Sequence, residues 1–234
     1  MLPTQYFDVI DNNDDFIVIN KYSNVDFHCS DEGLGIVAKV SQSLGGVHLF
    51  PVHRLDKMTS GLLVMAKSSA IAAKFVELFE RRKVSKYYIA ISDQKPKKKQ
   101  GLIKGDMKKG RNGSYLLLKT NENPAITQFF SYSLAPNLRL FLLKPHTGKT
   151  HQLRVAMKSL GAPILGDSRY YPSNQQDDEQ KIGHLHAWQL SFELNGQQFL
   201  FEAQPKWPLE LVKKWLITNR EMNNVKWPEF GELL

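Results

Sequence analysis

Apolar and polar positions alternate along this chain with the period of strands in some segments and of helices in others. Two short apolar runs, 6–10 and 16–20, flank an acidic, turn-forming stretch and predict a β-hairpin. A second hairpin is predicted where the runs 185–194 and 198–203 flank an Asn-Gly pair. Further strands are predicted at 62–66, 87–91, 114–119, 125–134 and 138–144.

Three segments carry apolar residues at helical spacing. The first helix is predicted from Ser68 or Ser69 to about Arg82, with a serine hydroxyl as its N-terminal cap. The second is predicted over 150–160 and ends at a glycine. The third is predicted over 208–220, where a proline occupies the first turn. Its inward-facing residues are expected to be Leu211, Val212, Trp215 and Leu216.

The order of these elements predicts the fold class. Hairpins and single helices follow one another without regular βαβ units. We therefore expect an α+β fold with mixed, largely antiparallel sheets flanked by helices.

The composition is that of a folded protein with a basic surface. Hydrophobic residues make up 42% of the 234 positions, which is enough for a sizeable core. The net charge of +8 favours a polyanionic partner such as nucleic acid. Cys29 is the single cysteine, which excludes an intramolecular disulfide and a cysteine-based zinc site. No secretory signal or long apolar run is visible, so we expect a cytoplasmic protein without a membrane partner.

The stretch 95–113 is strongly basic and has the weakest pattern in the chain. One interpretation is a solvated loop. The other is a basic arm that follows a phosphate backbone. The residues alone leave both open.

A polar stretch between Pro51 and the predicted strand 62–66 is the strongest candidate for chemistry. It reads His53-Arg54-Leu55-Asp56, followed by Thr59-Ser60-Gly61. Polar loops at strand ends are where catalytic groups tend to be positioned. The alternative is a solvated turn in which Asp56 or Ser60 bonds the backbone.

This stretch resembles the signature of the RluA-like RNA pseudouridine synthases. Four other blocks resemble that family in its own order, namely 16–21, 86–90, 145–154 and 161–167. The resemblance implies an isomerase that converts uridine to pseudouridine in RNA, and a single pseudouridine synthase-like catalytic domain over 1–234. Many members carry an S4 RNA-binding domain ahead of the catalytic one. Here the blocks start almost at residue 1, so the catalytic domain is expected to bind RNA itself.

The resemblance also implies roles for individual residues. Asp56 would be the nucleophile or base that starts cleavage of the glycosidic bond. Tyr88 would stack on the target uracil and help to remove the C5 proton, and Arg154 would pair with Asp56. The expected substrate-binding residues are His53, Arg54, Thr59, Lys149 and His151. The partner would be a structured RNA, a ribosomal or transfer RNA stem-loop, and not DNA. No metal or organic cofactor is expected, and a monomer is the default.

These roles agree with general physical chemistry. A carboxylate that acts as nucleophile or base must be ionised, which a nearby guanidinium favours. A target base must be flipped out of its stack, which costs a few kcal/mol. Stacking on an aromatic ring offsets roughly 1–3 kcal/mol of that cost.

Several alternatives remain at this point. Tyr87 is an alternative to Tyr88, because neighbours on a strand face opposite sides. Arg154 lies one residue from the apolar stripe of its helix, so a surface arginine is the alternative there. His184 and His186 share a strand face, but without a third ligand they are expected to pack or hydrogen-bond.

Two features depart from the family pattern. Tyr22 follows Lys21 where the family usually has proline, and Lys149 stands where it usually has arginine. Lysine keeps the charge but loses bidentate geometry.

Two other functions compete with the synthase. One is a catalytically inactive RNA-binding or ribosome-assembly factor of the same fold. The other is a hydrolase using Ser60, although no Gly-x-Ser-x-Gly elbow surrounds that serine.

Overall fold

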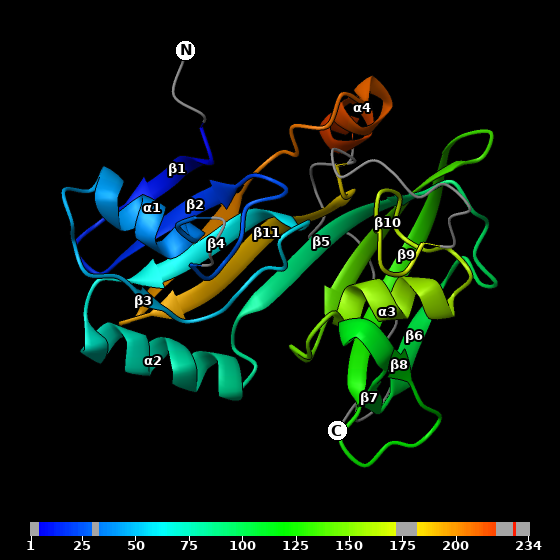
Figure 1. Ribbon diagram of the computed structural model, residues 1–234, viewed down its shortest axis with the longest axis horizontal. Coiled ribbons are helices and arrows are strands. Elements are labelled where there is room, and N and C mark those ends of the chain that lie inside the picture. Colours follow the sequence, from blue (N-terminus) through cyan, green and yellow to red (C-terminus); the bar gives the residue numbers. More distant parts are fainter. Residues whose placement is uncertain (1–4, 30–32, 172–181, 219–226, 228–234) are drawn as a thin grey trace. The chain divides into compact units, whose positions relative to one another are not determined.

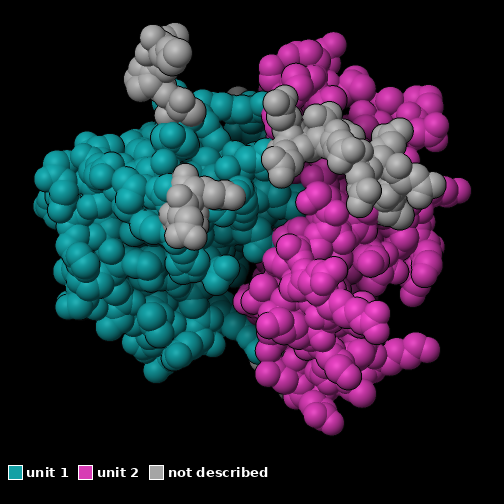
Figure 2. Space-filling model, viewed as in Figure 1, with its two compact units in different colours: residues 1–88, 185–206 teal, residues 89–184, 207–234 magenta. Residues whose placement is uncertain are grey.

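The computed structural model describes residues 5–29, 33–171, 182–218 and 227, and the chain forms two compact units (Figures 1 and 2). Unit 1 comprises residues 1–88 and 185–206, and unit 2 comprises residues 89–184 and 207–234. Strand β5 (Ser85–Ser92) begins in unit 1 and ends in unit 2.

Unit 1 contains a mixed sheet. Its strands run in the order β1 (Phe7–Asn12), β2 (Phe16–Lys21), β4 (Ser60–Ala66) and β11 (Leu185–Leu194), with β3 (Phe50–Pro51) also paired to β4 and β12 (Gln197–Glu202) to β11. The β4–β11 pair is parallel, and the other pairs are antiparallel. Both predicted hairpins, β1–β2 and β11–β12, are confirmed.

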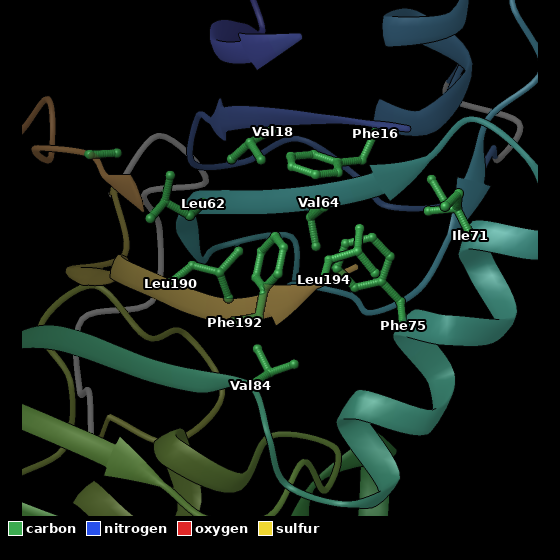
Figure 3. Close-up of a cluster of buried hydrophobic side chains, with 12 residues drawn as sticks. Phe16, Val18, Leu62, Val64, Ile71, Phe75, Val84, Leu190, Phe192 and Leu194 are labelled. Carbon is green, nitrogen blue, oxygen red and sulfur yellow. The ribbon is translucent and has the colours of Figure 1, made fainter. Parts of the chain in front are cut away.

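The core of unit 1 lies between this sheet and helix α2 (Ser69–Glu80) (Figure 3). Every residue of β2 and β4 is buried, which explains their nearly continuous apolar runs. Phe75 of α2 packs edge-on against Phe16 of β2 and Phe192 of β11. The helix begins as predicted, because the Ser68 hydroxyl accepts the N–H of Ile71 at 3.3 Å.

Helix α1 (Ile36–Ser43) belongs to unit 1 and has no counterpart among the predicted elements. Its eight residues bury only Ile36 and Val40. Two apolar positions are too few to establish a helical period from sequence.

Unit 2 contains antiparallel strands and a short ribbon. Next to β5, the strands run in the order β10 (Leu138–Pro145), β9 (Ala125–Ala135) and β6 (Gln100–Gly105), and the β10–β9 and β9–β6 pairs are antiparallel. The ribbon consists of β7 (Met107–Lys109) and β8 (Tyr115–Leu117), joined through the 3-10 turn η1 (Arg111–Gly113). Helix α3 (Gln152–Ser159) packs against β8 and β9, and α4 (Glu210–Thr218) packs against β9.

The interpretation of 95–113 as a solvated loop is wrong. Strands β6 and β7 and the turn η1 occupy most of it. Glycine and lysine have weak strand propensity, so the sequence pattern there is poor. Pairing along β9 overrides that local preference, and Ile103 and Gly105 are buried while Lys104 faces solvent.

The last helix differs in detail from the prediction. Val212 and Leu216 are buried as expected, and the ring of Trp215 lies 4.9 Å from that of Tyr132. Leu211 is 43% exposed, because two consecutive helical residues lie about 100° apart and cannot both face the sheet. Positions 219 and 220 of the predicted helix lie outside the described residues.

Both units combine helices with largely antiparallel strands, so the predicted α+β class is confirmed. Within the described parts of the chain, every helix is too short or too polar to traverse a lipid bilayer.

Candidate active site

The residues 52–59, here called the Asp56 loop, connect β3 to β4 in unit 1. The amide of Thr59 donates to the carbonyl of Asp56 at 3.0 Å and closes a tight turn. The side chains of Leu55 and Thr59 are buried, whereas Asp56 is partly exposed. The buried side chains of Leu55 and Thr59 therefore fix the backbone that carries the Asp56 carboxylate.

Lys21, at the end of β2, anchors one side of this loop. It is fully buried, and its ammonium group donates to three carbonyl oxygens, those of Tyr22 and Val25 at 3.0 Å and that of Lys57 at 3.2 Å. The Lys57 carbonyl is adjacent to Asp56. One side chain thus holds the backbone next to the carboxylate.

The charge on Lys21 is balanced between burial and neighbouring carboxylates. Burial lowers the pKa of Lys21 to about 7, while the negative charges of Asp26 and Asp56 oppose that shift. Three accepting carbonyls match the three N–H donors of the ammonium form. The geometry therefore favours the charged form.

His53 anchors the loop to the adjoining strand. Its Nε2 atom accepts the backbone N–H of Val64 in β4 at 3.0 Å, and its ring lies 5.2 Å from that of Phe79. Burial, with a smaller contribution from the charge of Lys86, lowers the pKa of His53 to about 3. The imidazole is therefore neutral near pH 7, as an accepting Nε2 requires.

The end of the loop is held by the short parallel contact between β4 and β11. His186 pairs with Ser60, and Ala187 pairs with Gly61. Gly61 has φ +113°, and a Cβ there would lie 2.3 Å from the carbonyl oxygen of Ala187. Only glycine permits this approach of the two strands.

Ser60 and His186 also form a buried side-chain hydrogen bond. Nε2 of His186 lies 2.7 Å from the carbonyl oxygen of Ala203 and must donate to it. Nδ1 of the neutral ring then accepts the Ser60 hydroxyl, at 2.8 Å. This geometry provides no support for the hydrolase alternative, since a backbone carbonyl lies where a carboxylate would orient the histidine of a triad.

Tyr88, in β5, is the buried member of the tyrosine pair, and Tyr87 is half-buried. Burial, and then the negative charge of Asp56, raise the pKa of Tyr88 above the ordinary tyrosine value. The negative charge of Asp56 therefore affects the phenol, and both residues proposed from the sequence belong to unit 1.

Two cations of the Asp56 loop, Arg54 and Lys57, are exposed. The guanidinium of Arg54 lies 5.9 Å from the centre of the Phe27 ring. Lys57 forms a salt bridge with Asp26 at 2.9 Å, with both side chains partly exposed. Arg54 is thus the predicted RNA contact that lies at the surface of the loop.

In unit 2, a single glutamine organises the segment before α3. The amide oxygen of Gln152 accepts the Thr147 hydroxyl at 2.7 Å and the Lys149 N–H at 3.0 Å. Its amide nitrogen donates to the carbonyl of Ile126 in β9 at 3.1 Å. Lys149 and the following His151, which has φ +57°, are therefore held on a fixed turn.

Arg154 lies inside this unit. Its Nε and Nη2 atoms each donate to a different oxygen of Asp167 at 2.8 Å, and Asp167 is fully buried. Arg154 is 6% exposed, so the surface alternative is wrong. The bidentate pair holds the guanidinium plane in one orientation.

Several of these residues received no role from the sequence, notably Lys21, Gln152 and Asp167. A signal existed for Lys21, because a lysine ends a mostly apolar strand. The interpretation of His184 and His186 as packing or hydrogen-bonded residues is confirmed, since each imidazole bonds a backbone carbonyl. Among the described residues, no three His, Cys, Asp or Glu side chains are placed to hold a metal ion.

Comparisons with known proteins identify the family of this chain. The family model described as RNA pseudouridylate synthase matches residues 15–159, which include Asp56, Tyr88 and Arg154. An uncharacterized RNA pseudouridine synthase of Haemophilus influenzae is 53% identical over 186 residues, covering 80% of this chain and 82% of that protein. A ribosomal large subunit pseudouridine synthase C of Rickettsia bellii is 35% identical over 214 residues, covering 87% of this chain and 69% of that protein.

Solved structures show the same fold. Human RNA pseudouridylate synthase domain containing 4 has a TM-score of 0.67 at 27% identity, covering 91% of this chain and 92% of that one. Human RNA pseudouridylate synthase domain containing 1 has a TM-score of 0.74 at 22% identity, covering 98% of this chain and all of that one. The resemblance stated from the sequence is confirmed: this chain belongs to the RNA pseudouridylate synthase family and is an isomerase that acts on RNA.

Proposed function

We propose that this chain isomerises one or more uridines in a structured ribosomal or transfer RNA, and that Asp56 opens the glycosidic bond. The observation that carries the proposal is the Asp56 loop, a carboxylate on an anchored turn whose charge acts on the buried phenol of Tyr88. A preorganised charged group beside an aromatic ring suits a base that must be held while its bond to the sugar breaks.

The reaction balances without an oxidant, a reductant or water. The bond from N1 of uracil to C1′ of ribose breaks, and a bond from C5 to C1′ forms. C5 loses a proton and N1 gains one. Asp56 serves either by adding to C1′ or by removing a ribose proton, and both routes need its ionised form.

Tyr88 is proposed to stack on the flipped uracil. Its raised pKa keeps the phenol protonated near neutral pH. The hydroxyl is then suited to donate a hydrogen bond, and less suited to serve as the base that takes the C5 proton. The pairing of Arg154 with Asp56 that the resemblance implies stays a prediction.

The RNA backbone is proposed to contact exposed cations and polar groups of both units, with the two units forming one catalytic domain. Arg54 is exposed on the Asp56 loop, and Lys149 and His151 lie on the turn before α3. His53 and Thr59 would act mainly by shaping the loop, since His53 accepts the Val64 N–H and Thr59 is 3% exposed.

A further RNA contact is proposed for the hairpin of residues 107–117, here called the basic ribbon. Lys108, Lys109 and Arg111 are exposed on it. The proposed basic arm is thus a pair of hydrogen-bonded strands and not an unstructured loop. Contacts of this kind make affinity fall steeply with salt.

The choice of RNA is supported by the relatives. The Rickettsia bellii protein is named for the large ribosomal subunit, which favours ribosomal over transfer RNA as the target. Either RNA would place the protein in the cytoplasm. A monomer is proposed, as one chain supplies all the groups named here.

The test is to map pseudouridine in the RNA of cells that lack this protein and carry either the wild-type gene or Asp56→Asn. Asp14→Asn, an exposed carboxylate of the β1–β2 turn, is the control. We expect wild type and Asp14→Asn to restore the same site and Asp56→Asn to restore none. Restoration by Asp56→Asn would overturn its role. If no site depends on the wild-type gene although it corrects a growth or ribosome-assembly defect, the inactive binding factor is favoured.

A further inference from the structure

Tyr170 connects the basic ribbon with the start of α3. It is 2% exposed, and its phenol oxygen accepts the N–H of Tyr115 in β8 at 2.8 Å. The same oxygen lies 2.9 Å from Nδ1 of His151. The rings of Tyr115 and Tyr170 both stand edge-on to that imidazole. One hydroxyl group therefore joins the ribbon to a residue expected to bind substrate.

Tyr170 also contacts the group that orients Arg154. The guanidinium carbon of Arg154 lies 5.0 Å from the centre of the Tyr170 ring. The backbone N–H of Tyr170 donates to Oδ1 of Asp167 at 3.2 Å, and Asp167 holds Arg154 in its bidentate pair. The ring and amide of Tyr170 thus support the same arginine from two directions.

Arg169 forms a second connection from the ribbon. Its side chain donates to the carbonyl of Asn112 in the turn η1. Its backbone N–H donates to Asp167 at 3.0 Å. The tip of the ribbon is therefore bonded to Arg169, which contacts the carboxylate that holds Arg154, and one strand is bonded to Tyr170, which contacts His151.

We propose that Tyr170 is a positioning residue that couples the basic ribbon to His151 and Arg154, so that RNA bound on the ribbon sets the orientation of these two side chains. The coupling rests on the proposed function. When the imidazole carries its proton on Nε2, Nδ1 of His151 accepts the phenol proton while the phenol oxygen accepts the Tyr115 amide.

Tyr170→Phe tests the positioning role without any assay of catalysis. It keeps the ring and removes the hydroxyl. Tyr171→Phe is the matched control, since that neighbour's hydroxyl donates to Asp93 at 2.6 Å. We expect Tyr170→Phe to speed hydrogen exchange of the Tyr115 amide about tenfold and to shift the ring ¹⁵N resonances of His151. If exchange and resonances match those of Tyr171→Phe, the positioning role is overturned.

The coupling itself is measured by a double-mutant cycle on kcat and KM for unmodified RNA. Lys109→Ala is combined with Tyr170→Phe and, separately, with Tyr171→Phe. We expect the effect of Lys109→Ala on kcat to shrink at least threefold in the Tyr170→Phe background and to stay unchanged in the control. Full additivity in both backgrounds would overturn the coupling. Wild-type protein inactive on every RNA would refute the proposed function and the coupling to catalysis, while the exchange result still decides the positioning role.

Discussion

The Asp56 loop of unit 1 and the Arg154 segment of unit 2 are held in place by different kinds of bond. Lys21 and His53 anchor the loop to backbone carbonyl and amide groups, and Gly61 lets two strands approach closely. Arg154 is instead held by the side chain of Asp167, thirteen positions later in the sequence.

The difference matters for substitutions. A backbone carbonyl or amide that accepts or donates a hydrogen bond is present in almost any residue type, whereas a carboxylate that binds Arg154 requires an acidic residue at that position. The loop is therefore held through backbone atoms, although two of its anchors, Lys21 in β2 and Ala187 in β11, lie far from it in the sequence. The Arg154 orientation depends on a second position that lies in another segment. Changes at the anchors of unit 1 should act through backbone geometry, and changes in unit 2 through lost charge pairing.

Gly61→Ala should produce the largest effect. The added methyl would meet Ala187 backbone atoms at 2.3–2.8 Å, on a residue whose φ is +113°. We expect the free energy of unfolding to fall by about 4 kcal/mol and activity to be lost. Denaturant unfolding and pseudouridine formation measure the two consequences.

Gly196→Ala is the control for backbone strain alone. Its φ is +80°, but nothing lies within 4 Å of an added Cβ. We expect a loss of about 1 kcal/mol with normal activity. Equal losses at the two glycines would contradict the close approach of β4 and β11 as the cause.

Asp167→Asn should come next. It keeps the size of the side chain but removes the negative charge that the buried guanidinium of Arg154 contacts at 2.8 Å. We expect the free energy of unfolding to fall by about 3 kcal/mol and kcat to fall with it. If this variant is as stable and active as wild type, Arg154 is not held by the pair, and the contrast between the two regions is lost.

A smaller effect is expected from pH. Burial lowers the pKa of His186 to about 4, below the unfolded value near 6.5. Between these values the unfolded chain binds more protons, so the free energy of unfolding decreases as the pH falls from 6.5 towards 4. We expect a loss of about 2 kcal/mol from this group between pH 7 and pH 4.5.

His186→Gln should flatten that part of the pH dependence, as measured by denaturant unfolding at several pH values. His53 contributes in the same direction, since its pKa is lowered to about 3. An unchanged slope in His186→Gln would show that the Ser60–His186 pair is not neutral in the folded protein.

Ser68→Ala should have the smallest effect. It removes the cap of α2, a helix that packs on β3 and β4 but carries none of the proposed catalytic residues. We expect a loss of about 0.5–1 kcal/mol in stability and unchanged kcat and KM. A fall in kcat would mean that lower stability alone reduces activity at the Asp56 loop. The losses of activity in the other variants would then have to be corrected for their losses of stability.

The same contrast explains what the sequence could predict. The hairpins, the buried strand β4 and helix α2 have local patterns and are confirmed. Helix α1 is too short for its period to be recognised, and β6 depends on pairing with β9. The sequence predicted Asp56, Tyr88 and Arg154 through a resemblance. It did not predict that Asp167 and Tyr170 contact Arg154, because those contacts exist only in the folded chain.

The most direct test of the central role of Asp56 is release of tritium from RNA labelled at uridine C5, taken from cells that lack this protein. Single-turnover rates would be compared for wild type, Asp56→Asn and Asp14→Asn. We predict release by wild type and Asp14→Asn at equal rates, and a loss of about a thousandfold or more in Asp56→Asn with RNA binding retained. Release by Asp56→Asn at the wild-type rate would contradict the assignment of Asp56 as the residue that opens the glycosidic bond.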